Sequence, residues 1–233
     1  MCGRFVVARA TSDLLPDLLS GLSLPSTGPD LVESYNVAPT DPVAAVRLRH
    51  GERELATPRW GFVPAWYPDL KKRPQPINAR IETVATSGMF RKAFASSRCI
   101  IPAQGYYEWV LTDDGKQPHY IHEPDGALAM AGIVTAWPDR SKADDDPDRW
   151  VISTAIITRD AHVAPGEVHD RMPACLTPDA YDAWLDPAVG ADDALALLDA
   201  RSLEVAHTLA HYAVSKAANS VKNNGPELIE PLG

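Results

Sequence analysis

The second residue of the chain is a cysteine, and its position gives it two potential nucleophiles. Cys2 follows the initiator Met1, and cysteine is small enough for a methionine aminopeptidase to remove that methionine. The new N-terminus would carry an α-amine with a pKa of about 7.7–8.0 and a thiol with a pKa of about 8.5, so both are usable near neutral pH. A 1,2-aminothiol condenses with an aldehyde, first as a Schiff base and then, by intramolecular attack of sulfur, as a thiazolidine. The alternative for Cys2 is an inert, buried cysteine.

Two other residues have side chains suited to proton transfer. Glu108 lies among aromatic residues in the segment 105–110, and an apolar setting would raise its pKa and suit acid–base work. Strand alternation could equally place Glu108 on a solvent-exposed face. His169 has a side chain whose ordinary pKa lies near neutrality, so it is a candidate general acid, although a surface histidine beside Asp170 is the alternative. Three more histidines are expected at the surface: His162, His207 and His211.

An aromatic cluster at residues 60–66 runs directly into a basic stretch. Residues 59–98 contain eight basic and two acidic residues, a net charge of +6, whereas the chain as a whole carries −9. Aromatic rings beside Lys and Arg suit single-stranded nucleic acid, because bases stack on the rings and phosphates meet the charges. Trp66 lies between prolines and is the candidate for exposure, whereas Trp60 is expected in the core. The alternative for the basic stretch is a solvated positive face.

The composition favours a soluble, intracellular protein. The 233 residues are 45% hydrophobic, without an apolar run of the roughly 18 residues that a membrane span needs and without a signal peptide. The three cysteines, Cys2, Cys99 and Cys175, are too few and too widely spaced for a disulfide framework or a structural zinc site. Cys99 and Cys175 are expected to be structural. No repeat or linker divides the chain, which predicts one domain over residues 1–233.

Elements that would position these residues can be read from the hydrophobic pattern. A strand over 3–9 would hold Cys2 in a sheet instead of leaving it on a frayed tail. Asn78 precedes Arg80 and Glu82, which could form no more than a structural ion pair. The further strands are expected at 43–49, 53–60, 98–101, 105–110, 119–123, 128–137, 150–158 and 204–210. The helices are expected at 11–19, around 90–94, from 178 and over 191–200.

Taken together, the motifs resemble those of a known family. Six of them occur in order before the C-terminal segments Val214-Ser215-Lys216 and Asn223-Asn224-Gly225-Pro226-Glu227: Met1-Cys2-Gly3-Arg4-Phe5, Tyr35-Asn36-Val37-Ala38-Pro39, Trp60-Gly61-Phe62-Val63-Pro64, Asn78-Ala79-Arg80-Ile81-Glu82-Thr83, Gly105-Tyr106-Tyr107-Glu108-Trp109 and His169-Asp170-Arg171-Met172-Pro173. This set is similar to the SRAP (SOS-response-associated peptidase) family, also called abasic site processing proteins. The likeness runs from residue 2 to about residue 228.

The resemblance implies an α+β fold, with curved, mainly antiparallel β-sheets that form an open, barrel-like core with flanking helices. It implies a protein that links covalently to abasic sites in single-stranded DNA and shields the lesion during repair. By family motif, Cys2 is the nucleophile, Asn78 orients the reacting groups, Glu108 shuttles protons and His169 protonates the sugar oxygen. The implied DNA contacts, by stacking, by phosphate binding or by blocking a duplex, are Arg4, Asn36, Pro39, Trp66 and Arg80.

Two other functions remain open from the sequence. One is a cysteine-type peptidase that uses Cys2 with His169 as base; the other is a non-covalent binder of single-stranded DNA or of junctions with a duplex. The resemblance also implies self-removal of Met1 and weak AP-lyase activity. No metal or organic cofactor is implied. The expected state is a monomer in the cytoplasm, associated with the nucleoid if the source is bacterial.

Overall fold

The computed structural model describes residues 2–9, 33–70, 75–124, 126–161 and 163–233. The helix predicted over 11–19, the basic residues 71–73 and His162 lie outside these ranges. None of the helices in the described parts of the chain is both long and apolar enough to span a membrane.

The first sheet holds the N-terminus. Its strand order is β13-β9-β8-β1-β2, and all its pairings are antiparallel. The short strand β1 lies between β8 and β2, and all three of its residues are buried. The strand predicted over 3–9 is shorter than expected, because it begins at Phe5, three residues after Cys2, and ends at Val7. The strands are β1 (Phe5–Val7), β2 (Ser34–Val37), β8 (Gly105–Thr112), β9 (Gly115–His122) and β13 (Ala210–Ala213).

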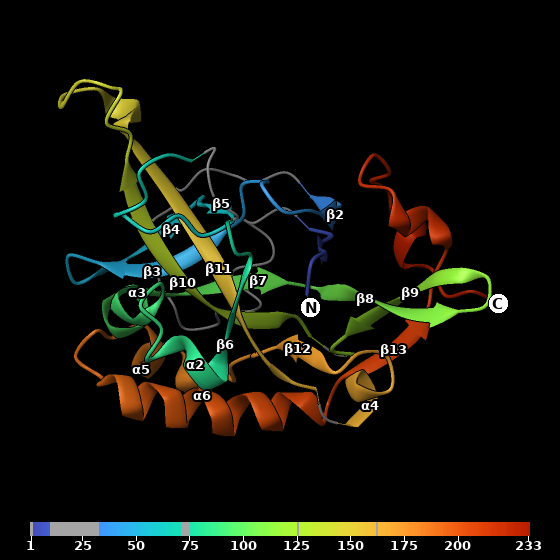
Figure 1. Cartoon of the computed structure of the whole chain (residues 1–233). Coiled ribbons are helices and arrows are strands. Elements are labelled where there is room, and N and C mark those ends of the chain that lie inside the picture. The colour runs from blue at the N-terminus through green and yellow to red at the C-terminus, as the bar shows by residue number, and fades with distance from the viewer. Residues whose placement is uncertain (1, 10–32, 71–74, 125, 162) are drawn as a thin grey trace.

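The second sheet has the order β12-β11-β10-β7-β3-β4, and β5 and β6 pair in parallel with β11. Its long strands β10 and β11 form a hairpin whose far end projects away from the body of the molecule (Figure 1). The strands are β3 (Ala45–Arg49), β4 (Glu52–Ala56), β5 (Arg59–Trp60), β6 (Asn78–Arg80), β7 (Arg98–Ala103), β10 (Leu128–Pro138), β11 (Trp150–Asp160) and β12 (Arg171–Pro173).

Helices gather on one side of the second sheet, with the long helix α6 along the outside (Figure 1). The strand predicted over 204–210 is wrong except at its last residue, because α6 continues to Ala206 and β13 begins only at Ala210. Ala194, Leu198, Ser202 and Ala206 recur every four residues and are all buried, so they form one helical stripe. The helices are α2 (Ile81–Val84), α3 (Arg91–Ser96), α4 (Val163–Gly166), α5 (Tyr181–Leu185) and α6 (Ala191–Ala206).

A buried cluster that draws on both sheets encloses the start of the chain. It contains Cys2, Phe5, Tyr106 and Trp60, and the rings of Phe5 and Trp60 meet edge to face with centroids 5.1 Å apart. Trp60 donates from its indole nitrogen to the carbonyl oxygen of Ile77, 2.9 Å away, and is thus a core residue as predicted. The α+β class and the curved, mainly antiparallel sheets are confirmed, and together the sheets form a half-open barrel.

Candidate active site

Cys2 lies three residues before the first residue of β1, Phe5, and is fully buried. Burial raises the pKa of its thiol well above the ordinary value, the charge of Glu108 adds to this increase, and the backbone N–H of Arg4 opposes it. The other two cysteines are also fully buried, and burial raises the pKa of both Cys99 and Cys175 to about 12. Cys99 and Cys175 are therefore structural, as predicted, and Cys2 differs from them by its place at the start of the chain.

Asn78 opens β6 and reaches Cys2 across the fold. Strand β6 pairs with β11, where Asn78 is opposite Ile156. The side-chain nitrogen Nδ2 of Asn78 donates a hydrogen bond to the backbone carbonyl oxygen of Cys2, 2.8 Å away. Its other polar atom, Oδ1, is buried and has no hydrogen-bond partner within the described residues. Asn78 thus fixes the Cys2 backbone and retains one acceptor for a further group.

Glu108 is on the inner face of β8, with only 2% of its surface exposed. Of the two placements that the sequence allowed, the structure shows the buried one. Burial raises the pKa of Glu108 to about 7. A carboxyl group with this pKa is partly protonated near neutral pH, so it can both accept and donate a proton.

His169 lies in the loop between α4 and β12, and its Nε2 is 3.9 Å from Oε2 of Glu108. The backbone N–H of Arg171 donates to Nδ1 of His169, 2.9 Å away, so the neutral ring carries its proton on Nε2. Burial lowers the pKa of His169, and the carboxylate of Asp170, 2.9 Å from Nδ1, opposes this change. The neutral His169 therefore presents an N–H donor on the side of the ring that faces Glu108.

Arg171 anchors the loop that carries His169. Its guanidinium donates to both carboxylate oxygens of Glu82, at 2.6 and 3.1 Å, and to the backbone oxygen of Thr158 at 2.7 Å. It also forms an ion pair with Asp160. Glu82 pairs with Arg171 in this structure, whereas the sequence suggested Arg80 as its partner.

Arg4 and Asn36 form a network with the C-terminal segment. Nη1 of Arg4 donates to Oδ1 of Asn36 at 2.6 Å and to the backbone oxygen of Ala218 at 3.0 Å, and its guanidinium lies over the Trp109 ring. Asn36 is buried, and its Nδ2 donates to two further backbone oxygens of that segment, each 2.9 Å away. Their assignment as DNA contacts stays a prediction, because here both side chains hold the protein's own backbone.

The remaining predicted DNA contacts are accessible. Pro39 is exposed in the turn after β2, and Arg80 is exposed at the end of β6, on the same strand face as Asn78. Trp66 is 54% exposed, as predicted, and meets the Tyr67 ring edge to face. It also lines a pocket of about 490 Å³ whose rim includes three basic residues: Arg91, Lys92 and Arg140.

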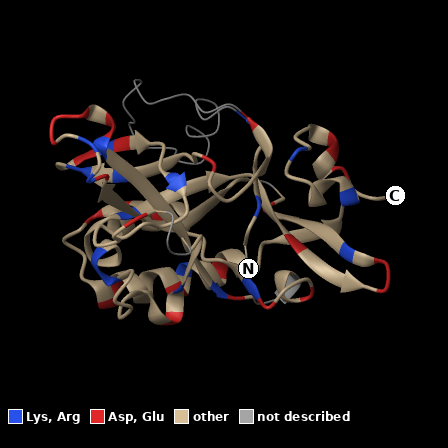
Figure 2. Ribbon diagram, turned by 45° about the horizontal axis from the view of Figure 1, so that its top comes forward, with Lys and Arg blue, Asp and Glu red and all other residues tan. Residues whose placement is uncertain are grey.

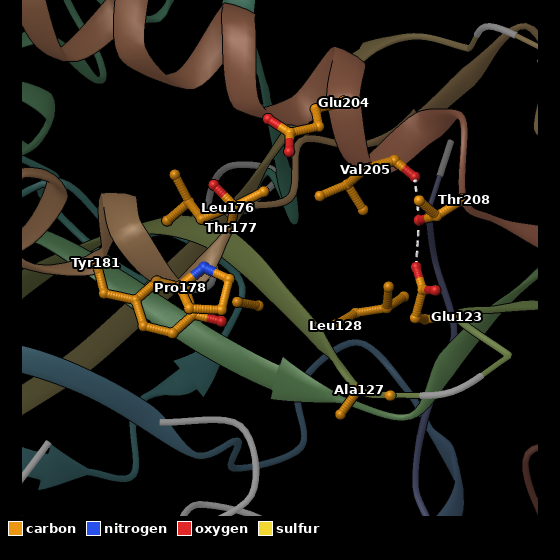
Figure 3. Close-up of a pocket in the computed structure, with 12 residues that line it drawn as sticks. Glu123, Ala127, Leu128, Leu176, Thr177, Pro178, Tyr181, Glu204, Val205 and Thr208 are labelled. Carbon is orange, nitrogen blue, oxygen red and sulfur yellow. Dashed lines mark hydrogen bonds between the residues drawn. The ribbon is translucent and has the colours of Figure 1, made fainter. Parts of the chain in front are cut away.

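The charged residues are unevenly distributed along the ribbon (Figure 2). Acidic residues occupy the far ends of the β8–β9 and β10–β11 hairpins, away from the chain start. A separate pocket of about 330 Å³ lies between the start of β10 and the end of α6, where Thr208 donates a hydrogen bond to Glu123 (Figure 3). Its lining includes none of the predicted site residues, so we place the candidate active site at Cys2.

Sequence reasoning missed three polar residues near this site. Tyr106 shares the inner face of β8 with Glu108, and its buried hydroxyl has no hydrogen-bond partner within the described residues. His119 is directly opposite Glu108 on β9, and its Nδ1 is 3.2 Å from Nδ1 of His211. His211, expected at the surface, is only partly exposed, with 18% of its side chain accessible. Strand register, which the local sequence does not give, was the missing information.

Comparisons with known proteins point to one family. The family model described as SOS response associated peptidase (SRAP) matches residues 1–221. The chain is 35% identical to abasic site processing protein YoqW of Bacillus subtilis, over 99% of both chains, and 32% identical to abasic site processing protein YedK of Escherichia coli, over the whole of both. A crystal structure of a protein from Bacteroides thetaiotaomicron has the same fold, with a TM-score of 0.79, 23% identity and coverage of 99% and 100% of the two chains.

Proposed function

The chain belongs to the SOS response associated peptidase (SRAP) family, and on that premise we propose that it processes abasic sites in single-stranded DNA through a covalent bond to Cys2. The relatives named as abasic site processing proteins support the DNA lesion as substrate. An abasic sugar interconverts between a closed hemiacetal and an open aldehyde. The aldehyde is the electrophile with which an N-terminal cysteine condenses.

The proposed reaction begins once Met1 has been removed. The α-amine of Cys2 adds to the aldehyde carbon, and the carbonyl oxygen leaves as water to give a Schiff base. The thiol then adds to the imine carbon, its proton passes to the nitrogen, and the thiazolidine ring closes. Aldehyde and neutral aminothiol thus give thiazolidine and one water, and an amine that starts as ammonium releases one additional proton.

Three side chains around Cys2 can carry these steps, and their convergence on the second residue is the observation on which the proposal rests. Asn78 holds the Cys2 carbonyl, and its unoccupied Oδ1 can accept a hydrogen bond from the amine or from a sugar hydroxyl. Glu108 has a pKa of about 7, so it can take the ammonium proton and can act as the acid–base group of the dehydration step. The Nε2–H of His169 can donate to the sugar ring oxygen and favour the open aldehyde.

The electrostatics of Cys2 favour this reaction over a cysteine-type peptidase. A cysteine hydrolase needs a thiolate stabilised by a neighbouring cation, which lowers the pKa of the thiol. Here burial and the Glu108 charge raise the pKa of the Cys2 thiol instead. The amine can act first in the proposed reaction, and the intramolecular ring closure compensates for the low thiolate fraction.

The surface beside the site suits a single strand. Arg80 is exposed two residues from Asn78 on the same strand face, within reach of a phosphate next to the lesion. The pocket beside Trp66 combines an exposed aromatic ring with Arg91, Lys92 and Arg140, so a flanking base could stack there while its phosphates meet positive charge. We propose these residues, with Pro39 at the exposed turn, as the strand-binding surface.

Intact mass spectrometry tests the proposal directly. The untagged protein is mixed with a single-stranded oligonucleotide that carries one abasic site. We expect a species whose mass equals protein without Met1 plus DNA minus one water. The same DNA without the lesion, and the Cys2→Ala variant with the lesion, should give no such species.

Two variants separate the chemical steps. Cys2→Ser keeps the amine but replaces sulfur by a hydroxyl, so it should form a Schiff base that borohydride can trap and no stable adduct. A protein that retains Met1 or an N-terminal tag should form no thiazolidine. A stable adduct from a tagged protein, or none from a correctly processed one, would overturn the covalent proposal.

A further inference from the structure

Titratable residues occur on three adjacent strands of the first sheet, from Glu108 on β8 through His119 on β9 to His211 on β13 at the sheet edge. Glu108 on β8 is directly opposite His119 on β9, and opposed residues of adjacent strands have their Cβ atoms about 4.5–5.5 Å apart on the same face. On β13, His211 shares that face and places its Nδ1 3.2 Å from Nδ1 of His119. Nε2 of His211 is 3.3 Å from a carboxylate oxygen of Glu167, whose side chain is 75% exposed.

From this arrangement we infer that His119, His211 and Glu167 form a proton relay between Glu108 and solvent. The inference rests on the proposed function, because the proposed condensation releases one proton inside a buried site when the amine starts as ammonium. Glu108 takes that proton from the amine nitrogen. It passes to His119, then across the Nδ1–Nδ1 contact to His211, and leaves through Glu167, so that Glu108 returns to its carboxylate form.

The two facing Nδ1 atoms suit such a transfer. In the neutral pair, one Nδ1 carries a proton and donates it to the other, whose own proton is then on Nε2. Transport of one proton takes three linked transfers. His119 accepts a proton at Nε2, the proton on its Nδ1 moves to Nδ1 of His211, and His211 gives up the proton on its Nε2. Burial lowers the pKa of His119, and the nearby His211 adds to this, so His119 favours its neutral form and does not hold the proton.

His169 is closer to solvent than Glu108 but cannot conduct a proton in the same way. Its Nδ1 accepts a hydrogen bond from the backbone N–H of Arg171, which fixes its single proton on Nε2. Because Nε2 already carries that proton, the ring nitrogen nearest Glu108 has no free lone pair with which to accept another. His169 is therefore suited to donate to the substrate, and the His119–His211 pair to remove the proton from Glu108.

The surroundings of the pair contain the groups that the relay needs. Glu108 faces it from β8, and Glu167 faces it from the turn after α4, which lies beside β13 (Figure 1). His122 and Tyr212, on the same two strands, point to the opposite face, where their rings meet with centroids 5.4 Å apart. The relay thus runs along one face of the sheet edge only.

Chemical rescue by imidazole tests the relay. The rate of adduct formation with an abasic oligonucleotide is measured at pH 7.5 for the wild-type protein and for His211→Ala, with increasing imidazole. We expect the variant to be slower by about tenfold, because one acid–base group of the path is lost. Imidazole should restore its rate and leave the wild-type rate unchanged. His207→Ala, which alters an exposed histidine after α6, is the matched control and should behave as wild type in both respects.

The possible outcomes separate the relay from the proposed function. A wild-type protein that forms no adduct would remove the reaction itself and the relay with it. Adduct formation by His211→Ala at the wild-type rate would overturn the relay alone. A slow variant whose rate imidazole does not restore would show that His211 has a packing role and would also overturn the relay. His211→Gln, which keeps the volume but cannot transfer a proton, should be slow with an unchanged Tm, so that misfolding cannot account for the effect.

Discussion

The side-chain nitrogen of Asn78 donates to the backbone carbonyl oxygen of Cys2 at 2.8 Å, and this bond joins the first residue of β6 to the segment that leads into β1. The two residues are 76 positions apart in the chain. A nucleophile at a chain terminus has more freedom than one inside a strand, so an external hydrogen bond to its backbone is needed to fix its direction of attack. Asn78 is the residue that does this here.

Replacing Asn78 should therefore slow the reaction without unfolding the protein. We expect Asn78→Ala to reduce the rate of adduct formation by about 100-fold, because orientation of the nucleophile is lost. Asn78→Asp keeps an acceptor oxygen but loses the donor to Cys2, so it should be nearly as slow. Single-turnover gel assays give the rates and thermal unfolding gives the Tm; a fast Asn78→Asp would show that the bond to Cys2 is dispensable.

The stability of the protein should depend on pH through Glu108. Burial raises the pKa of Glu108 to about 7, whereas in the unfolded chain the group has an ordinary value of about 4.3. Between these two pH values the folded state therefore binds more protons than the unfolded state. The stabilisation that the raised pKa contributes is complete below about pH 4.3 and is lost as the pH rises through about 7. Relative to Glu108→Gln, the wild type should lose up to about 3 kcal/mol of unfolding free energy between pH 5 and pH 8.

Urea denaturation of both proteins at the two pH values measures this difference. Glu82 provides a contrast of opposite sign, because the hydrogen bond from Arg171 lowers the pKa of its carboxyl group. Glu82→Gln should accordingly be less stable than wild type at pH 8, and this difference in unfolding free energy should be smaller at low pH. If the difference in unfolding free energy between wild type and Glu108→Gln is the same at pH 5 and pH 8, the pKa of Glu108 is not raised.

The role of His169 can be isolated with a substrate that needs no ring opening. If its Nε2–H donates to the sugar oxygen, His169→Gln should be slow on an abasic site and close to wild type on an oligonucleotide that carries an acyclic aldehyde. The expected loss on the abasic site is about 100-fold, the scale of one general acid. Asn78→Ala should be slow on both substrates. Equal losses for His169→Gln on both substrates would contradict the assignment.

The buried hydroxyl of Tyr106 gives a prediction about stability. Because it has no hydrogen-bond partner within the described residues, Tyr106→Phe should leave the unfolding free energy unchanged or raise it by about 1 kcal/mol. The adjacent Tyr107 is the control, since its hydroxyl donates to the backbone oxygen of Tyr35 at 2.8 Å. Tyr107→Phe should destabilise by about 1 kcal/mol. A destabilised Tyr106→Phe, measured by urea denaturation, would reveal a partner for that hydroxyl.

Asn36 should stabilise the C-terminal segment around residues 220–223 by hydrogen bonding to its backbone. It is buried and bonds to Arg4 and to two backbone oxygens of that segment, those of Ser220 and Asn223. Asn36→Ala should destabilise by about 2 kcal/mol and should expose Lys222 to trypsin. The exposed Asn223, altered to alanine, is the comparison and should have a smaller effect. Unchanged proteolysis of Asn36→Ala would leave Asn36 free for the DNA contact predicted from the sequence.

The sequence alone determined the type of chemistry. An N-terminal cysteine is a 1,2-aminothiol by covalent structure, and no fold is needed to establish its preference for aldehydes. Alternating apolar residues likewise predicted most of the strands, because the two-residue period of a strand is local. The strand expected over 204–210 failed where Ala206 continued a helical stripe that is visible only once α6 is packed on the sheet.

Only the tertiary structure decided which polar residues meet Cys2. Asn78, Glu108 and His169 come from β6, from β8 and from a loop before β12, and strand pairing sets their distances. The pKa of Glu108 also depends on burial, which follows from how the two sheets close over it and not from its neighbours in the chain. The His119–His211 contact has the same origin, because two strands separated by about 90 residues come into register only in the folded sheet.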